Sequence, residues 1–337
     1  MPPRGGRASR GRKEAGLARG PPPLLERETA IDLLLQTLMI GIANGAVIAL
    51  IALGYTLVYG IIELINFAHG DLFMLGSFAA LTVVGALGFT AFGATTATPA
   101  WLAILLALVA SAVFCGILNV IIERVAYRRL RHAPRLAALI SAIGVSFILL
   151  TAGLYWKGPS PQNFPNLIPD FDILRDVFGI RTIVQFNLKE IFVVATAIPL
   201  MIVVTLFIRR TKMGKAMRAV AQDREMAGMV GIDVDRVISF TFLLGGLLAG
   251  AAGLIYGLFN ENTSFNLGFS AGLKAFTAAV LGGIGNVTGA MLGGFILGIL
   301  GSLTVFYIDA RWEQVVVFSV LVLILVFRPR GLLGEEV

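Results

Sequence analysis

The chain is dominated by long apolar segments that alternate with short polar ones between residues 33 and 327. Eight of these segments are predicted to be transmembrane helices, because a helix of about 20 apolar residues crosses the hydrocarbon layer of a membrane. Two shorter segments that contain glycine, residues 54–66 and 273–285, are predicted to be short or interrupted helices. The eight long segments are residues 33–53, 72–92, 101–122, 136–156, 190–208, 237–259, 287–307 and 315–327.

Composition indicates the same fold class, an all-α polytopic membrane protein. Of the 337 residues, 57% are hydrophobic and only 14% are charged, and the mean hydropathy is +0.86. A soluble chain of this length could not bury so much apolar surface. The single cysteine, Cys115, and the two histidines, His69 and His132, are too few to predict a disulfide framework or a metal site.

The distribution of basic residues predicts the orientation. The net charge of +7 would suggest a nucleic-acid partner in a soluble protein, but here no nucleic acid is expected and basic residues mark membrane sides. Residues 1–29, 123–135, 209–236 and 328–330 hold 21 of the 27 Lys and Arg residues, so they are expected to share the cytoplasmic side. Both termini are then cytoplasmic, provided that each short segment counts as a crossing or as half of one. Loop 157–189 is then expected on the extracytoplasmic side of the membrane.

The chain divides by composition into three parts. Residues 1–29 are rich in Arg, Gly and Pro and lack apolar periodicity, which predicts a disordered basic cytoplasmic tail or an over-extended start of the reading frame. Residues 30–333 form the membrane domain, and residues 334–337 are a short C-terminal tail.

A similar pattern occurs in residues 33–122 and 237–327, which predicts two similar halves. Each has a full span, a short segment, a polar break and further spans; the breaks are INFAHGD (65–71) and LGGIGNVTG (281–289). Interrupted helices at corresponding places in two halves are typical of a translocation path, although glycine-rich helices are also common in packed bundles. The candidate path residues are Asn66, His69, Asp71, Gly282, Gly283, Gly285 and Asn286.

The polar group Glu63, Asn66, His69 and Asp71 has two interpretations. Ionisable residues at membrane depth are costly, so they could form a proton relay or an ion site. Alternatively, His69 and Asn66 satisfy backbone groups at a helix break and Asp71 caps the next helix, which is the favoured interpretation. Lys274 is expected to extend toward the outer interface, with binding of a substrate carboxylate as the alternative.

The polar segment 209–236 lies between two apolar ones and carries seven basic and four acidic residues. Met213, Ala216, Met217 and Val220 fall on one helical face, with Lys215, Arg218 and Gln222 on the opposite face. Gly231 is expected to end a second short helix, and Asp233 or Asp235 to cap the next one. The segment is either a docking surface for a soluble cytoplasmic partner or an ordinary basic loop. No GxxxxGK[ST] motif is present, so any ATP must be bound by another subunit.

Four motifs, in order, resemble one known family. They are GYTLVYGIIELINFAHGDLFMLGSF (54–78), ALISAIGVS (138–146), TKMGKAMRAVAQDREMAGMVGIDVDRV (211–237) and LKAFTAAVLGGIGNVTGAMLGGFILG (273–298). They are similar to the inner-membrane permeases of branched-chain amino acid ABC importers, in particular the H-type leucine/isoleucine/valine permease, over residues 33–333. Permeases for urea and short amides share this architecture and remain an alternative.

The resemblance implies a transport subunit of the bacterial inner membrane, not an enzyme. Its partners would be a second homologous permease, two cytoplasmic ATPases that bind ATP-Mg, and an extracytoplasmic substrate-binding protein, with no cofactor on this chain. Segment 209–236 would couple to the ATPases, and the implied coupling residues are Met213, Gly214, Arg218, Ala219, Asp223, Ala227 and Gly231. The alternative from another class is a proton- or ion-coupled carrier that works through His69 and Asp71. An intramembrane hydrolase at Ser77 lacks a nucleophile elbow and an orienting acid.

Overall fold

The computed structural model describes residues 23–63, 66–90, 93–94, 98–131, 133–176 and 184–334. Within these residues, eight helices are long and apolar enough to cross a membrane, which confirms the predicted all-α class and the expected number of long spans. Each of the two sheets is only a pair of two-residue antiparallel strands. The long helices are α1 (Pro23–Ile62), α2 (Ala68–Ala86), α3 (Ala100–Ile122), α4 (Arg135–Lys157), α6 (Leu188–Arg210), α9 (Val234–Asn260), α11 (Val287–Tyr307) and α12 (Glu313–Phe327, extended to Ala310 by the 3-10 turn η3, Ala310–Trp312).

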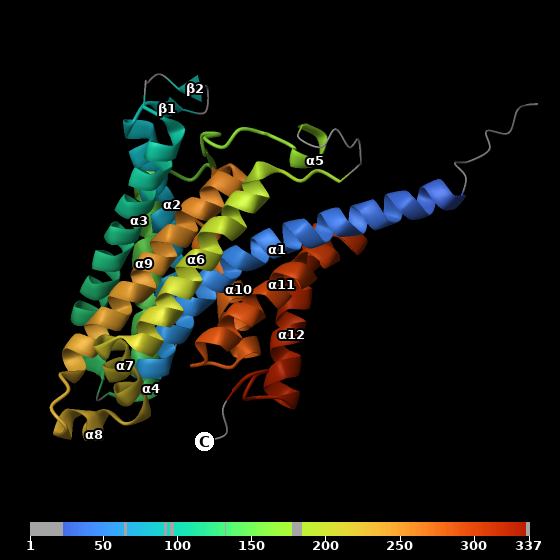
Figure 1. Ribbon diagram of the computed structural model, residues 1–337. Helices are drawn as coiled ribbons and strands as arrows, with labels where there is room; N and C mark the ends of the chain where they lie inside the picture. Colours follow the sequence, from blue (N-terminus) through green and yellow to red (C-terminus); the bar gives the residue numbers. More distant parts are fainter. Residues whose placement is uncertain are drawn as a thin grey trace, which may run out of the picture.

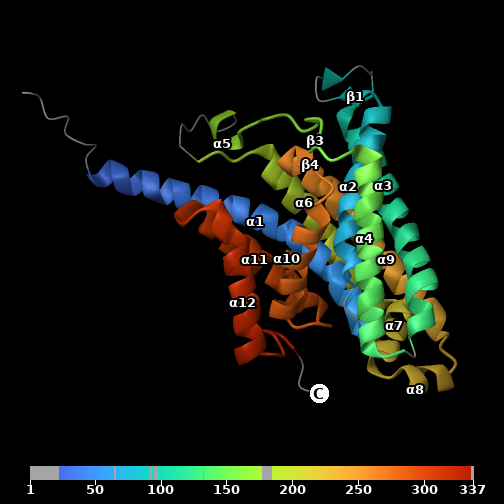
Figure 2. The same cartoon turned by 180° about the vertical axis from the view of Figure 1, so that it is seen from behind.

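The shorter elements lie at the two ends of the bundle. Figure 1 shows α7 (Lys212–Gln222) and α8 (Arg224–Met229) at one end, called the α8 end below. The strands lie at the opposite end, called the β4 end (Figures 1 and 2): β1 (Phe89–Thr90), β2 (Gly93–Ala94), β3 (Gln162–Asn163) and β4 (Asn262–Thr263). The remaining elements are the π-helix η1 (Glu123–Tyr127), the 3-10 turn η2 (Arg128–Leu130), α5 (Ile173–Asp176) and α10 (Leu267–Gly282).

Helices α1, α2 and α9 form the centre of the bundle. In the apolar stretch of α1, 83% of the residues are buried, against 6% in α12. Since both stretches are strongly apolar, the exposed faces of the outer helices are suited to lipid rather than water. Figure 2 shows α3 and α4 covering one side of the centre, with α10, α11 and α12 on the other.

Glycine lets the central helices approach backbone to backbone. A Cβ atom on Gly298 of α11 would lie 2.2 Å from the Cα atom of Gly45 in α1. A Cβ atom on Gly250 of α9 would lie 2.3 Å from the carbonyl oxygen of Ser111 in α3. Small residues at such contacts are the usual means of packing helices in lipid, so the glycine-rich composition has a packing role here.

One predicted short segment is not separate. Residues 54–62 continue α1 without a break, and the chain leaves the helix only at Glu63, which has a positive φ of 53°. The other predicted short helix is confirmed as α10, which has 16 residues. Of the two segments expected to be similar, residues 33–122 and 237–327, only the second has a separate short helix after its first full span.

The continuity of α1 changes the predicted path of the chain. The described start of α1 lies at the β4 end and the end of α12 lies at the α8 end (Figure 1). The prediction that both termini are cytoplasmic is made on the condition that residues 54–66 count as a crossing or as half of one. Residues 54–62 instead prolong α1, so the sides of the two termini stay a prediction. Of the predicted N-terminal tail, residues 1–29, the first 22 lie outside the described residues, and residues 23–29 belong to the start of α1. Of the predicted C-terminal tail, residues 334–337, the last three lie outside the described residues.

Candidate functional site

Segment 209–236 forms the two short helices that its pattern predicts, each with a side-chain cap. The Thr211 hydroxyl accepts a hydrogen bond from the Gly214 N–H (3.0 Å) at the start of α7, and Asp223 Oδ1 accepts one from the Met226 N–H (3.0 Å) at the start of α8. Such caps satisfy amide groups that the first turn of a helix leaves free. Of the two candidates for the next cap, Asp233 caps α9, whereas Asp235 pairs with Arg131.

The two helices are fixed to the ends of α6 and α1. Gly214 packs so closely on α6 that a Cβ atom there would lie 2.2 Å from the Ile208 carbonyl oxygen. Arg218 donates a hydrogen bond to this same carbonyl group. Arg224 donates two hydrogen bonds, of 3.1 and 2.7 Å, to the Ile61 carbonyl oxygen at the end of α1. A force on α7 or α8 would therefore reach two long helices directly.

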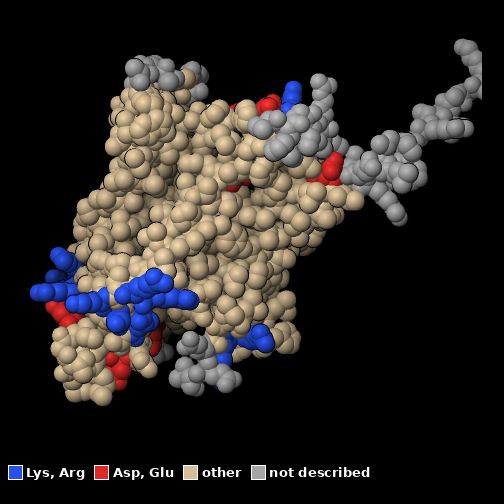
Figure 3. Space-filling view, viewed as in Figure 1, with Lys and Arg blue, Asp and Glu red and all other residues tan. Residues whose placement is uncertain are grey.

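Helix α8 and the residue after it present apolar side chains to solvent. Met226, Met229 and Val230 are 57%, 73% and 76% exposed, and we call them the α8 patch. Basic side chains gather at the same end of the molecule (Figure 3). An exposed apolar group beside polar residues is typical of a protein contact site. The predicted apolar face of α7 lies toward the bundle: Met217 and Val220 are buried, and Met213 and Ala216 pack partly buried against the core.

The first group of predicted path residues is buried at the start of α2. Asn66, His69 and Asp71 are at most 3% exposed. The Tyr127 hydroxyl donates to Asn66 Oδ1 (2.7 Å), and the Ser146 hydroxyl donates to Asp71 Oδ2. These bonds link the start of α2 to η1 and α4. The His69 ring packs edge-on against another ring of the core, that of Tyr55, with 4.7 Å between the centroids.

The second predicted group forms the turn from α10 to α11 at the α8 end. Gly283 and Gly285 have positive φ values of 102° and 94°, which glycine adopts most readily. Asn286 Oδ1 accepts from the Gly289 N–H (2.9 Å) as the cap of α11. The Gly282 carbonyl oxygen accepts a hydrogen bond from the Leu333 N–H (3.0 Å). This turn therefore holds the C-terminal segment, and neither predicted group lines the large cavity described next.

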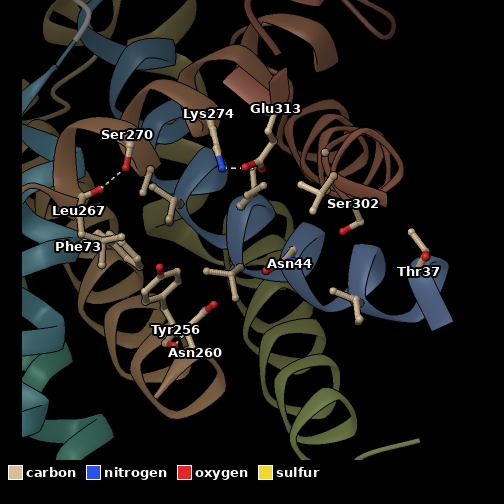
Figure 4. A pocket seen from close by; sticks show the side chains of 18 of the residues that line it. Thr37, Asn44, Phe73, Tyr256, Asn260, Leu267, Ser270, Lys274, Ser302 and Glu313 are labelled. Carbon is tan, nitrogen blue, oxygen red and sulfur yellow. Dashed lines mark hydrogen bonds and ion pairs between the residues drawn. The ribbon is translucent and has the colours of Figure 1, made fainter. Parts of the chain in front are cut away.

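A cavity of about 590 Å³ lies toward the β4 end, between α1, α2, α9, α10, α11 and the start of α12. Figure 4 shows the charged ends of Lys274 and Glu313 side by side in its lining, with 2.6 Å between Lys274 Nζ and Glu313 Oε1. The sequence predicts that Lys274 extends toward the outer interface, but its ammonium group pairs with Glu313 inside the cavity. The polar lining of the cavity also includes Thr37, Asn44, Tyr256, Asn260, Ser270 and Ser302.

The sequence pattern does not reveal the cavity, because residues of six helices, from α1 and α2 to α12, come together only in the folded chain to build it. One signal was present: Asn44 stands within an apolar stretch, where a polar side chain is costly unless it has a function or a partner.

At the β4 end, one ion-pair cluster holds loop 157–189 against the bundle. The Lys189 ammonium contacts the carboxylates of Asp170 and Glu261. Its hydrogen bond to Asp170 lowers the pKa of that carboxyl group below its usual value. Lys189 therefore joins the loop to the chain just after α9, outside the cavity.

Comparison with known proteins identifies the family. Residues 37–325 match the family described as "Branched-chain amino acid transport system / permease component". The chain belongs to this permease family. It is 41% identical to the high-affinity branched-chain amino acid transport system permease protein LivH of Escherichia coli K12 over 301 residues, which cover 89% of this chain and 96% of that protein.

Other relatives extend the range of similarity. The permease is 40% identical to the corresponding protein BraD of Pseudomonas aeruginosa, over the same shares of the two chains. It is 26% identical to the fructose import permease protein FruG of Bifidobacterium longum, over 77% of this chain and 74% of that protein. No solved structure matches the chain significantly. As a member of this family, the permease is a transport subunit rather than an enzyme.

Proposed function

We propose that this permease is the membrane subunit through which an ATP-driven importer moves leucine, isoleucine and valine across a bacterial cytoplasmic membrane. The observation that carries the proposal is the similarity, at 40–41% identity over 89% of the chain, to relatives with that description. One relative at 26% identity is described as a fructose permease, so the substrate class is inferred from the stronger similarity.

Segment 209–236 is the docking element for the ATPase subunits. Its attachment to α6 and α1 and the exposed α8 patch support this role, because a coupling element needs both a contact surface and rigid links to the membrane helices. The residues assigned to coupling are Met213, Gly214, Arg218, Ala219, Asp223, Ala227 and Gly231.

The transport cycle is alternating access. ATP-Mg binding in two ATPases brings them together and draws α7 and α8 with them, so that the ends of α6 and α1 move. The cavity at the β4 end then exchanges substrate with a binding protein docked on that side. A second, homologous permease completes the membrane part. In this cycle ATP-Mg is bound by the ATPases, and this chain binds no cofactor of its own.

The competing function is an ion-coupled carrier that uses His69 and Asp71. Both residues are buried and neither lines the cavity, so the importer is favoured. The energy source separates the two functions. We expect uptake of radiolabelled leucine in the native host to survive a protonophore while cellular ATP is maintained. Loss of uptake under those conditions would favour the carrier.

Copurification tests the assembly. The tagged permease, extracted from its host in a gentle detergent, should bring down two ATPase subunits and a second permease, identified by mass spectrometry. A deletion strain should lose uptake of leucine, isoleucine and valine and regain it with the wild-type gene. Loss of urea or acetamide uptake instead would reassign the substrate while retaining the importer.

A further inference from the structure

The cavity at the β4 end contains a pair of opposite charges in an otherwise uncharged lining. Lys274 on α10 and Glu313 at the start of α12 are the only charged residues among the described residues that line it. Their side chains are 24% and 28% exposed, so both reach the cavity while most of their surface is covered. We propose that this pair binds the carboxylate and ammonium groups of a zwitterionic amino acid during its passage. The inference deepens the proposed function and depends on it.

The pair retains unused binding capacity. A lysine ammonium has three N–H donors, and one of them is used in the bond to Glu313 Oε1. No described residue bonds the second carboxylate oxygen of Glu313. A bound zwitterion can therefore place its carboxylate on Lys274 and its ammonium on Glu313, giving four alternating charges without breaking the existing pair. Charge-assisted bonds of this kind are among the stronger ones in proteins.

A glycine allows this arrangement. A Cβ atom on Gly301 of α11 would lie 3.0 Å from Glu313 Oε1, closer than ordinary contact. Because Gly301 has no side chain, the Glu313 carboxylate can lie against α11 and face Lys274.

The remaining lining fits an apolar side chain. Val47 and Ile51 of α1 and Phe73 of α2 line the cavity, and Phe73 packs edge-on against Tyr256, with 5.4 Å between the ring centroids. Figure 4 shows these two rings together, apart from the ion pair. A charged pair in one region and apolar groups in another match the two parts of a branched-chain amino acid. The volume of about 590 Å³ lies within the range of about 300–1,000 Å³ that is usual for small-molecule sites.

Site-directed labelling tests the proposal directly. The only native cysteine, Cys115, is fully buried, so Ser302→Cys would place the one accessible thiol of this chain in the cavity. The rate of N-ethylmaleimide labelling is measured in membranes that contain the whole complex. Leucine at about ten times its Kd should slow labelling about tenfold, since about nine-tenths of the sites are filled. Isocaproate, which lacks the ammonium group, and isopentylamine, which lacks the carboxylate, should protect far less.

Variants of the pair provide the second measurement. Lys274→Met or Glu313→Gln should raise the leucine concentration needed for protection by about 10- to 100-fold, the loss of one charge-assisted hydrogen bond. Lys189→Met is the control, because it removes a lysine from an ion-pair cluster outside the cavity; it should leave protection unchanged. The exchanged pair Lys274→Glu with Glu313→Lys tests a purely structural role.

The outcomes are distinct. Equal protection by leucine and both analogues, full protection in Lys274→Met, absence of any protection, or normal protection and uptake in the exchanged pair would overturn the inference. Uptake of leucine by the Ser302→Cys strain is measured in parallel. If the Ser302→Cys strain takes up leucine but leucine does not protect the cysteine from labelling, only the proposed zwitterion site is wrong. If the wild type does not take up leucine, the proposed function is wrong.

Discussion

Gly214 lies at the corner where α6 turns into α7, and the absence of a side chain allows this corner to close. Its N–H is held by Thr211, and the space where a Cβ atom would lie is occupied by the Ile208 carbonyl group. Resemblance to the family singles out this residue, but a sequence does not contain the reason, which is a contact between two backbones. Gly54 instead leaves room for a side chain, because a Cβ atom there would lie 2.4 Å from His69 Nε2.

Gly214→Ala is predicted to reduce leucine uptake strongly while the protein remains in the membrane. A Cβ atom 2.2 Å from a backbone oxygen cannot be accommodated by a side-chain movement, so α7 must shift on α6, at a cost of about 1–3 kcal/mol. Gly228→Ala on α8 is the matched control, since nothing lies within 4 Å of its Cβ position. Uptake and membrane abundance are measured together. Equal uptake by the two variants would contradict a role for this contact.

Helix α1 shows what an apolar pattern can and cannot specify at the scale of an element. The pattern correctly places an apolar helix from residue 33 onward, but Gly54 and the polar residues after it suggest a break that is absent. Glycine does not end this helix, because neighbouring helices hold its backbone in place and the missing side chain leaves room for His69. The helix ends at Ile62, just before Glu63, whose φ is positive.

The α8 patch carries the prediction at this scale. Met229→Asp would place a carboxylate in a surface that is apolar and 73% exposed at this residue, so it should disfavour burial against a partner without affecting the fold. We expect copurified ATPase to fall about tenfold or more, since removing a central apolar contact often costs over 1 kcal/mol. Arg311→Asp, an exposed site at the β4 end, serves as the control. Retention of ATPase by Met229→Asp would exclude α8 as a docking surface.

At the scale of the whole molecule, the fold class and the number of long spans follow from hydrophobicity alone, whereas topology and the cavity do not. Counting crossings depends on every break being correct, and one misplaced break moves an entire terminus to the other side of the membrane. The cavity depends on how α1, α2, α9, α10, α11 and α12 assemble. Asn44 and Lys274 are visible in the sequence, but their common location is set only by packing.

The path of the chain predicts which positions react from each side of the membrane. Single cysteines at Ser160→Cys, near β3, and Gln222→Cys, at the end of α7, lie at opposite ends of the bundle, and both native residues are exposed. An impermeant maleimide should label the first in intact spheroplasts and the second only after permeabilisation, because the basic α8 end is expected to face the cytoplasm. A third variant, Thr29→Cys, within the first turns of α1, tests on which side of the membrane α1 begins. It should react together with Ser160→Cys if α1 crosses once from the β4 end, and together with Gln222→Cys if both termini are cytoplasmic.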